Sequence, residues 1–216
     1  MVTCSQAEVT QIDGSFLYIS ELLHRVSNEY TGAISFAYRA AARSSNDEAK
    51  AALHDVIDHL HALAEAHRAL RPPIRHEPVD LTEHVTKLCQ TMASAGLDKR
   101  GITFHVSLSE PVFLDAKRCW RAKLIIAELI TNASRHAFLA GGDSISVSIE
   151  IESGWIVCRV SDNGSSCTEF NLGLGSQIVN AIADEIEGRV ERRFSGSGTT
   201  ITLSFPKEPS DPSDSW

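Results

Sequence analysis

Four side chains able to take part in chemistry recur at helical spacing within the segment RAKLIIAELITNASRHAF, Arg121 to Phe138. They are a carboxylate, a carboxamide, a guanidinium and an imidazole, from Glu128, Asn132, Arg135 and His136. Spacings of three and four residues place them on one face of a helix. Such a set can polarise a nucleophile, hold a divalent metal through oxygen ligands and neutralise phosphate charge. An ordinary amphipathic helix with a solvated polar face has the same pattern.

Two glycine-bearing turns follow this segment. Asp162, Asn163 and Gly164 come directly after an apolar run typical of a strand, where the acid can accept a hydrogen bond from the exocyclic amine of a purine. The triplet from Gly173 to Gly175 opens a helical pattern, where backbone amides at a helix N-terminus favour a phosphate. Either triplet alone is most often a simple turn. Their order, with a GSGTTITLSFP hairpin after them, is more informative.

Two long helices are predicted ahead of these motifs. The first begins at about Ser15, and the second follows a polar break from Ser44 to Asp47. Pro72 and Pro73 end the second helix, because proline lacks the amide donor and disfavours a helical conformation in the preceding residue. Two such helices form an antiparallel hairpin. Since a lone hairpin buries little, we expect a homodimer through residues 15–72, as a four-helix bundle.

The remainder predicts an α+β domain over residues 73–206. Helical patterns occupy about 81–95, the central segment and 176–186; strand patterns occupy 102–108, 112–114, 144–152, 155–161, 189–194 and 199–205. Most of these strands pair as hairpins, so we expect helices on one face of a mostly antiparallel sheet. Residues 1–14 are predicted to be a flexible lead and residues 207–216 a disordered tail.

Composition excludes several classes of protein. The 216 residues are 43% hydrophobic and 22% charged, as in ordinary globular domains. Apolar runs fall far short of the roughly 18 residues of a spanning helix, and the first residues lack a signal-peptide pattern, so we expect a cytoplasmic protein off the membrane. Five scattered cysteines indicate reduced thiols. A net charge of -8 argues against nucleic-acid binding.

In these motifs the chain resembles the sensor histidine kinases, in particular the HWE type and its close relatives. ELLHRVSNEY is similar to that branch's phosphoacceptor segment, with His24, Arg25 and Asn28 at the matching places. ELITNASRHAF resembles the N box, and DNG and LGLGSQIV resemble the two glycine boxes of the Bergerat ATP-binding fold. The resemblance runs from about residue 15 to residue 206. It implies a helical hairpin followed by an α/β-sandwich ATP-binding domain.

The resemblance also implies a reaction and its residues. His24, near Asn28, would take the phosphoryl group of ATP and pass it to an aspartate on a response-regulator receiver, with the signal coming from a separate sensor protein. Glu128 would assist the attacking group and Asn132 would hold Mg²⁺. The other implied ATP-binding residues are Arg135, His136, Asp162, Gly164, Gly173, Gly175 and Thr199. Four further histidines of the hairpin are assigned to the surface, namely His54, His59, His61 and His67.

Two departures from the family pattern leave an alternative open. Ser166 stands where a second glycine belongs, and the loop from Ser165 to Leu172, a lid over ATP in the family, is short. A histidine phosphotransferase or docking scaffold with a degenerate nucleotide domain would keep His24 and would not need the ATP-binding residues. An unrelated ATPase of the same fold fits less well, because a helical hairpin in front of the fold is the arrangement of a kinase.

Overall fold

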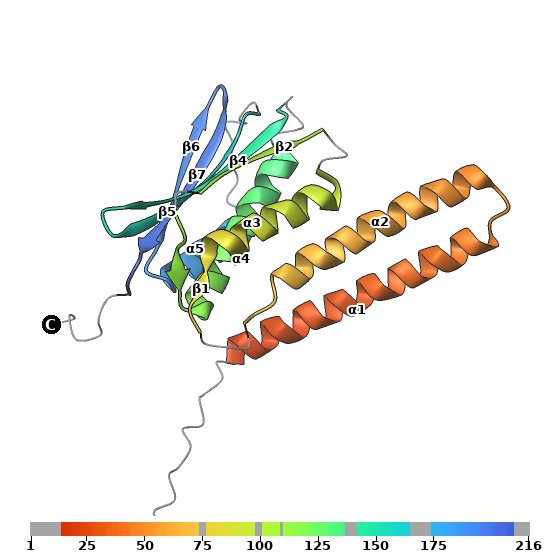
Figure 1. Ribbon diagram of the computed structural model, residues 1–216, viewed down its shortest axis with the longest axis horizontal. Coiled ribbons are helices and arrows are strands. Elements are labelled where there is room, and N and C mark those ends of the chain that lie inside the picture. The colour runs from red at the N-terminus through yellow and green to blue at the C-terminus, as the bar shows by residue number, and fades with distance from the viewer. Residues whose placement is uncertain are drawn as a thin grey trace, which may run out of the picture.

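The computed structural model describes residues 14–73, 77–97, 101–108, 110–136, 142–164 and 174–209; within them, the side chains of 14–20, 95, 96, 135, 136 and 174 are not described. A helical hairpin lies beside an α/β domain, and its turn points away from that domain (Figure 1). The predicted α+β class, with a hairpin ahead of a helix-and-sheet domain, is confirmed. In the described ranges, every helix is too short or too polar to cross a lipid bilayer.

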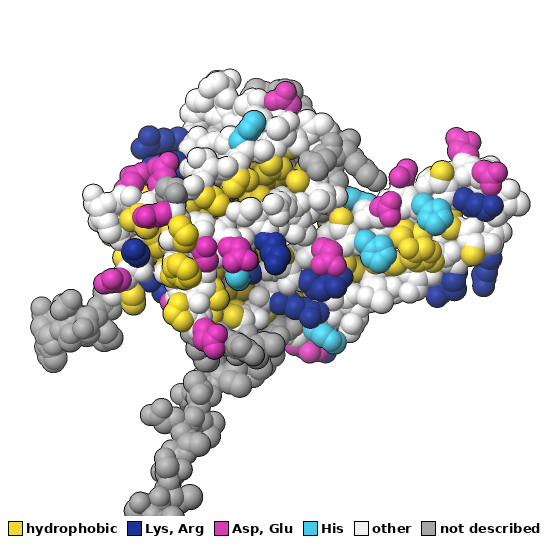
Figure 2. Space-filling model, in the orientation of Figure 1, with side chains coloured by type: hydrophobic (Ala, Val, Ile, Leu, Met, Phe, Trp, Pro, Cys, Tyr) yellow, Lys and Arg dark blue, Asp and Glu magenta, His cyan; other side chains and the backbone are white. Residues whose placement is uncertain are grey.

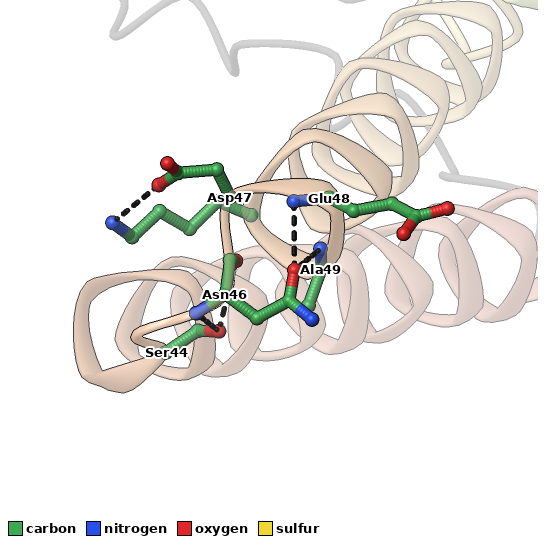
Figure 3. A network of polar contacts seen from close by, with 6 residues as sticks. Ser44, Asn46, Asp47, Glu48 and Ala49 are labelled. Atoms are coloured by element: carbon green, nitrogen blue, oxygen red, sulfur yellow. Dashed lines mark hydrogen bonds and ion pairs between the residues drawn. The ribbon is translucent and has the colours of Figure 1, made fainter.

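The hairpin consists of α1 (Gly14–Arg43) and α2 (Asp47–Ala69). Its turn lies where the sequence predicts it, because Asn46 caps α2 (Figure 3). The Asn46 Oδ1 accepts hydrogen bonds from the backbone amides of Glu48 at 2.8 Å and Ala49 at 3.2 Å. The first backbone amides of a helix have no acceptor within it, so the Asn46 side chain supplies the missing hydrogen-bond acceptor.

The second domain begins with a short strand, β1 (Val79–Asp80), which pairs with β3 (Phe113–Leu114). Its helices are α3 (Leu81–Met92), continued by a π-helical turn (Ala93–Leu97), α4 (Ala116–His136) and α5 (Leu174–Asp184). The strands of its main sheet are β2 (Thr103–Leu108), β4 (Ser144–Glu152), β5 (Trp155–Asp162), β6 (Arg189–Ser195) and β7 (Gly198–Pro206).

The main sheet has the order β2-β4-β5-β7-β6. β2 runs parallel to β4, and the other neighbours are antiparallel. The three helices cover one face, where α4 contributes Ile125, Ile126 and Ile130 to a core shared with Ile145 of β4 and Phe205 of β7. All five are fully buried. Burial of apolar side chains on one face of each element is therefore what positions α4 against the sheet.

Two local features differ from the sequence prediction. α4 starts at Ala116, five residues before Arg121, because the Asp115 carboxylate accepts from the amides of Lys117 and Arg118, each at 3.0 Å. β1 is not predicted, since two residues are too few to show an alternating pattern.

The end of α2 is fixed to the second domain. The indole Nε1 of Trp120, on α4, donates to the carbonyl oxygen of Leu70 at 2.9 Å. Ala69 and Leu70 pack against the core of the second domain. The Arg71 guanidinium also reaches back to the hydroxyl of Ser27 on α1, at 3.4 Å. The hairpin and the helices of the second domain thus share one junction.

Three cysteines lie deep in the second domain. Cys89, Cys119 and Cys158 are free thiols and at most 1% exposed. Burial raises their pKa values to about 12, 11 and 12 respectively. Because the thiolate is the reactive form, these residues are unreactive apolar side chains of the core. Cys4 and Cys167 lie outside the described residues.

Candidate functional site

Glu128 of α4 meets the first turn of α5 at Gly175. A methyl group added at Gly175 would lie 2.6 Å from the Glu128 Oε1 atom, closer than real side-chain contacts allow. Glycine therefore lets the α5 backbone approach the carboxylate directly. Asn132 lies one turn further along α4, on the same face, and is half-buried. These three predicted site residues are thus gathered where α4 and α5 meet.

Asp162, at the end of β5, forms a second group of predicted site residues. Its Oδ1 atom accepts from the backbone amide of Gly164 at 3.0 Å and from that of Thr199 at 3.4 Å. Gly198 precedes Thr199 with a φ of +135°, and a methyl group there would lie 1.9 Å from the Asp162 carbonyl oxygen. The turn between β6 and β7 passes so close to β5 that a side chain at Gly198 is excluded.

Asn163 has a structural role that sequence reasoning missed. Its Oδ1 accepts from the amides of Asp143 at 2.9 Å and Ser144 at 3.0 Å, and its Nδ2 donates to the Asp143 carboxylate at 2.8 Å. It therefore holds the start of β4 beside the end of β5. The only signal in the sequence is the tendency of asparagine to bond to backbone amides, and the amides that it meets are about twenty residues away.

His24 lies on the exposed side of α1, one turn from Asn28. The His24 Nδ1 and Asn28 Nδ2 atoms are 3.3 Å apart. Within the described part of the chain, the hydrogen bonds of His24 do not reach the second domain.

His54, His59 and His61 are exposed as predicted, whereas the surface assignment of His67 is wrong. His67 is half-buried, its ring centroid lies 5.2 Å from that of Tyr30, and burial lowers its pKa. It sits near the end of α2, where the hairpin meets the second domain, and this packing depends on α1 rather than on the local pattern of α2.

Several predicted site residues lie outside the described parts of the chain. The α4 helix includes Arg135 and His136, but their side chains are not described. Gly173, Ser166 and the loop from Ser165 to Leu172 are also outside the described residues.

The donor set at α4 suits a hard cation. In the described ranges, no group of three His, Cys, Asp or Glu side chains gathers as a metal site. Asn132 nevertheless offers an amide oxygen on this helix face, beside the carboxylate of Glu128, and Mg²⁺ usually takes one or two protein oxygens while keeping several waters and substrate phosphates. The residues present therefore fit magnesium bound together with a phosphate ligand.

Comparisons with known proteins agree with this arrangement. Residues 21–95 match the family described as histidine kinase, and residues 120–209 match the histidine kinase-, DNA gyrase B- and HSP90-like ATPases. The sensor histidine kinase PdtaS of Mycobacterium tuberculosis is 28% identical over 197 residues, and that of Mycolicibacterium smegmatis is 29% identical. Both alignments cover 87% of this chain and 39% of the relative, so the chain spans about two fifths of these proteins.

A solved structure shows the same fold. The histidine kinase domain of the Erythrobacter litoralis blue-light activated kinase EL346 superposes with a TM-score of 0.56 at 20% identity, covering 82% of this chain and 95% of that one. The two family matches follow one another along the chain in the order hairpin, then ATPase domain. The two family matches, in this order, are those found in histidine kinases, and the match over residues 21–95 fits the HWE-type branch. The ATPase match also implies ATP binding.

Proposed function

We propose that this chain is a two-component histidine kinase, which transfers the γ-phosphoryl group of ATP to His24 and then to an aspartate of a response regulator. The observation that carries the proposal is an exposed His24 with a carboxamide at its Nδ1 atom, in a chain whose second domain matches an ATPase family. Residues 15–72 form the dimerising phosphoacceptor unit in this proposal, and residues 73–206 form the ATP-binding unit.

Asn28 orients the nucleophile. In the structure its Nδ2 faces the His24 Nδ1. With the amide group rotated by half a turn, Oδ1 would take the place of Nδ2 and accept the hydrogen bond of Nδ1–H. The proton then stays on Nδ1, and the lone pair of Nε2 faces solvent. Nε2 attacks the γ-phosphorus, the bond to the bridging oxygen breaks, and ADP leaves with that electron pair. An aspartate carboxylate later attacks the same phosphorus and releases neutral His24.

The second domain would bind the nucleotide around its two groups of side chains. Asp162, near Thr199 and Gly164, accepts from the adenine amine. Gly173 and Gly175 are the glycines assigned to the phosphates, and Gly175 lies in the first turn of α5, where backbone amides favour an anion. Asn132 holds Mg²⁺, which neutralises phosphate charge when bound. Glu128 assists the attacking group, and Arg135 and His136 lie near the phosphates.

The partners follow from the exposed surface of the hairpin. A second copy of residues 15–72 completes a four-helix bundle, and a receiver domain docks on that bundle near His24. Such a protein works in the cytoplasm, where ATP and response regulators are available.

Incubation with radiolabelled ATP and Mg²⁺ tests the proposal. The wild-type protein is expected to acquire an acid-labile, alkali-stable phosphate, which His24→Ala and Asn132→Ala abolish. His59→Ala is the matched control, because it removes an equally exposed histidine of the hairpin and should leave labelling unchanged. Labelling that survives His24→Ala would show that another residue accepts the phosphate.

The alternative, a phosphotransferase on a kinase-derived scaffold, has a different signature. Such a protein takes no label from ATP, yet accepts phosphate at His24 from a phosphorylated receiver. Asn132→Ala would then have no effect on transfer, whereas His24→Ala would still abolish it.

A further inference from the structure

A cavity of about 360 Å³ lies where α2 of the hairpin meets α3 and α4 of the second domain. Most of the side chains lining it are charged or polar, and they include Arg68, Glu83, His84, Lys87, Thr91 and Lys123. Figure 2 shows basic and acidic side chains gathered along this junction. The cavity is separate from the residues assigned above to phosphotransfer.

Lys123 of α4 is the unusual member of this group. It is 8% exposed and lines the cavity. In the described part of the chain, no carboxylate pairs with its ammonium group, and the nearby Cys119 thiol is buried and uncharged because burial raises its pKa to about 11. Burial accordingly lowers the pKa of Lys123. Burying an ammonium group without a counter-charge costs free energy, because the group loses most of its contact with water and gains no opposite charge in return.

The neighbours of Lys123 do not neutralise it. The Glu65 carboxylate is already held by Arg68, at 2.7 Å. Glu83 is exposed to solvent, and Lys87 adds a further positive charge. His84 is half-buried beside these cations. Burial, and then the positive charge of Lys123, lower its pKa. With His84 neutral, three cations line the cavity against two carboxylates, one of which is committed to Arg68.

We propose that this cavity binds a small multivalent anion, a phosphate or polycarboxylate compound, with Lys123 as its buried counter-ion and Lys87 as a second contact. Such a ligand would supply the charge that Lys123 lacks and would be held by charge-assisted hydrogen bonds. Because α2 belongs to the hairpin and Lys123 to the second domain, the ligand would also tie the two units together. This site goes beyond the proposed kinase reaction and does not depend on it.

Calorimetric titration of the whole chain with inorganic phosphate, and separately with citrate, tests the proposal at constant ionic strength. Lys123→Met is expected to weaken binding by at least about ten-fold, the effect of losing one charge-assisted hydrogen bond. This variant should fold, because Met keeps the length of the side chain and removes the buried charge. Lys87→Gln should weaken binding less, and Lys50→Gln, at the far end of the hairpin, is the control that should bind as wild type does.

The nucleotide site is the competing location for phosphate, and Asn132→Ala distinguishes the two. In the proposal, Asn132→Ala binds the probe as tightly as wild type, and ATP does not displace it. The proposal is overturned if neither probe binds, if Lys123→Met binds as tightly as wild type, or if Asn132→Ala or ATP removes the binding. Any of these results leaves the kinase proposal standing.

Discussion

The hairpin and the second domain differ in how completely they bury their apolar side chains. In the second domain, Ile130, Ile149 and Phe205 are fully buried between helices and sheet. Among the described side chains of the hairpin, Ile57 is the large one that is fully buried, and Phe36 is 69% exposed. The second domain closes its own core, whereas two helices alone cannot cover both of their apolar stripes. In the described residues, the hairpin therefore leaves large apolar side chains such as Phe36 open to solvent, which agrees with the dimer proposed above.

Their polar contacts differ in the same way. Most side-chain bonds within the two helices of the hairpin connect residues two to four apart, such as Arg25 with Glu21 and Asn28 with His24. In the second domain, Asn163 bonds to Asp143 across twenty residues. The polar contacts of the hairpin are therefore mostly local, while the geometry of the ATP-binding part depends on contacts across the whole domain.

The largest expected effect is on the core of the second domain. Phe205→Ala should lower the free energy of unfolding by about 3–5 kcal/mol, because it leaves a cavity between sheet and helices. Urea denaturation of the two proteins measures this change in the free energy of unfolding. Phe113→Ala is the control: Phe113 is 62% exposed, so its loss should change the free energy of unfolding by less than about 0.5 kcal/mol. Equal losses from both variants would contradict a self-contained core.

The next effect concerns the partner surface of the hairpin. Phe36→Asp should weaken the homodimer by about ten-fold or more, since it places a charge in an apolar bundle, and should leave the fold of the monomer intact. Sedimentation equilibrium measures the dissociation constant. Phe113→Asp places the same charge on an exposed site of the second domain, and should not affect the dimer. A wild-type protein that stays monomeric at high concentration would refute the comparison.

The smallest effect is at the turn of the hairpin. Asn46→Ala should lower the free energy of unfolding by about 1 kcal/mol, because two amides at the start of α2 lose their acceptor (Figure 3). The shift in the thermal midpoint measures this, and faster amide exchange in α2 would localise it to the hairpin. Ser45→Ala, at the exposed neighbouring residue, is the control. An unchanged midpoint and unchanged exchange in Asn46→Ala would show that the cap does not stabilise the hairpin.

Local pattern was sufficient for most of the elements. Both helices of the hairpin follow from apolar spacing, and their turn from the polar run around Asn46. The two antiparallel pairs β4–β5 and β6–β7 follow from alternation on either side of short turns. The parallel pairing of β2 with β4 has no such signature, because α4 separates the two strands in the chain.

The sequence predicted which residue types form the candidate site, but it did not predict which of them contact one another. The spacing of Glu128 and Asn132 predicted a shared helix face, and the resemblance to a family supplied their roles. The approach of Gly175 to Glu128 and of Thr199 to Asp162 appears in the folded chain alone. The glycine triplet that ends at Gly175 has the pattern of an ordinary turn in the sequence. In the structure, Gly175 is where α5 comes into close contact with α4.

Local sequence patterns account for most of the helices and strands, for the position of the hairpin turn, and for the side chains that share the polar face of α4. These properties depend on neighbours within a few residues, through helical period, alternation and capping. What those faces meet depends on the folded chain: Trp120 bonds to Leu70, Asn163 bridges two strands, and Lys123 is buried. Such contacts join residues far apart in the chain, and burial, unlike periodicity, is a property of the assembled fold.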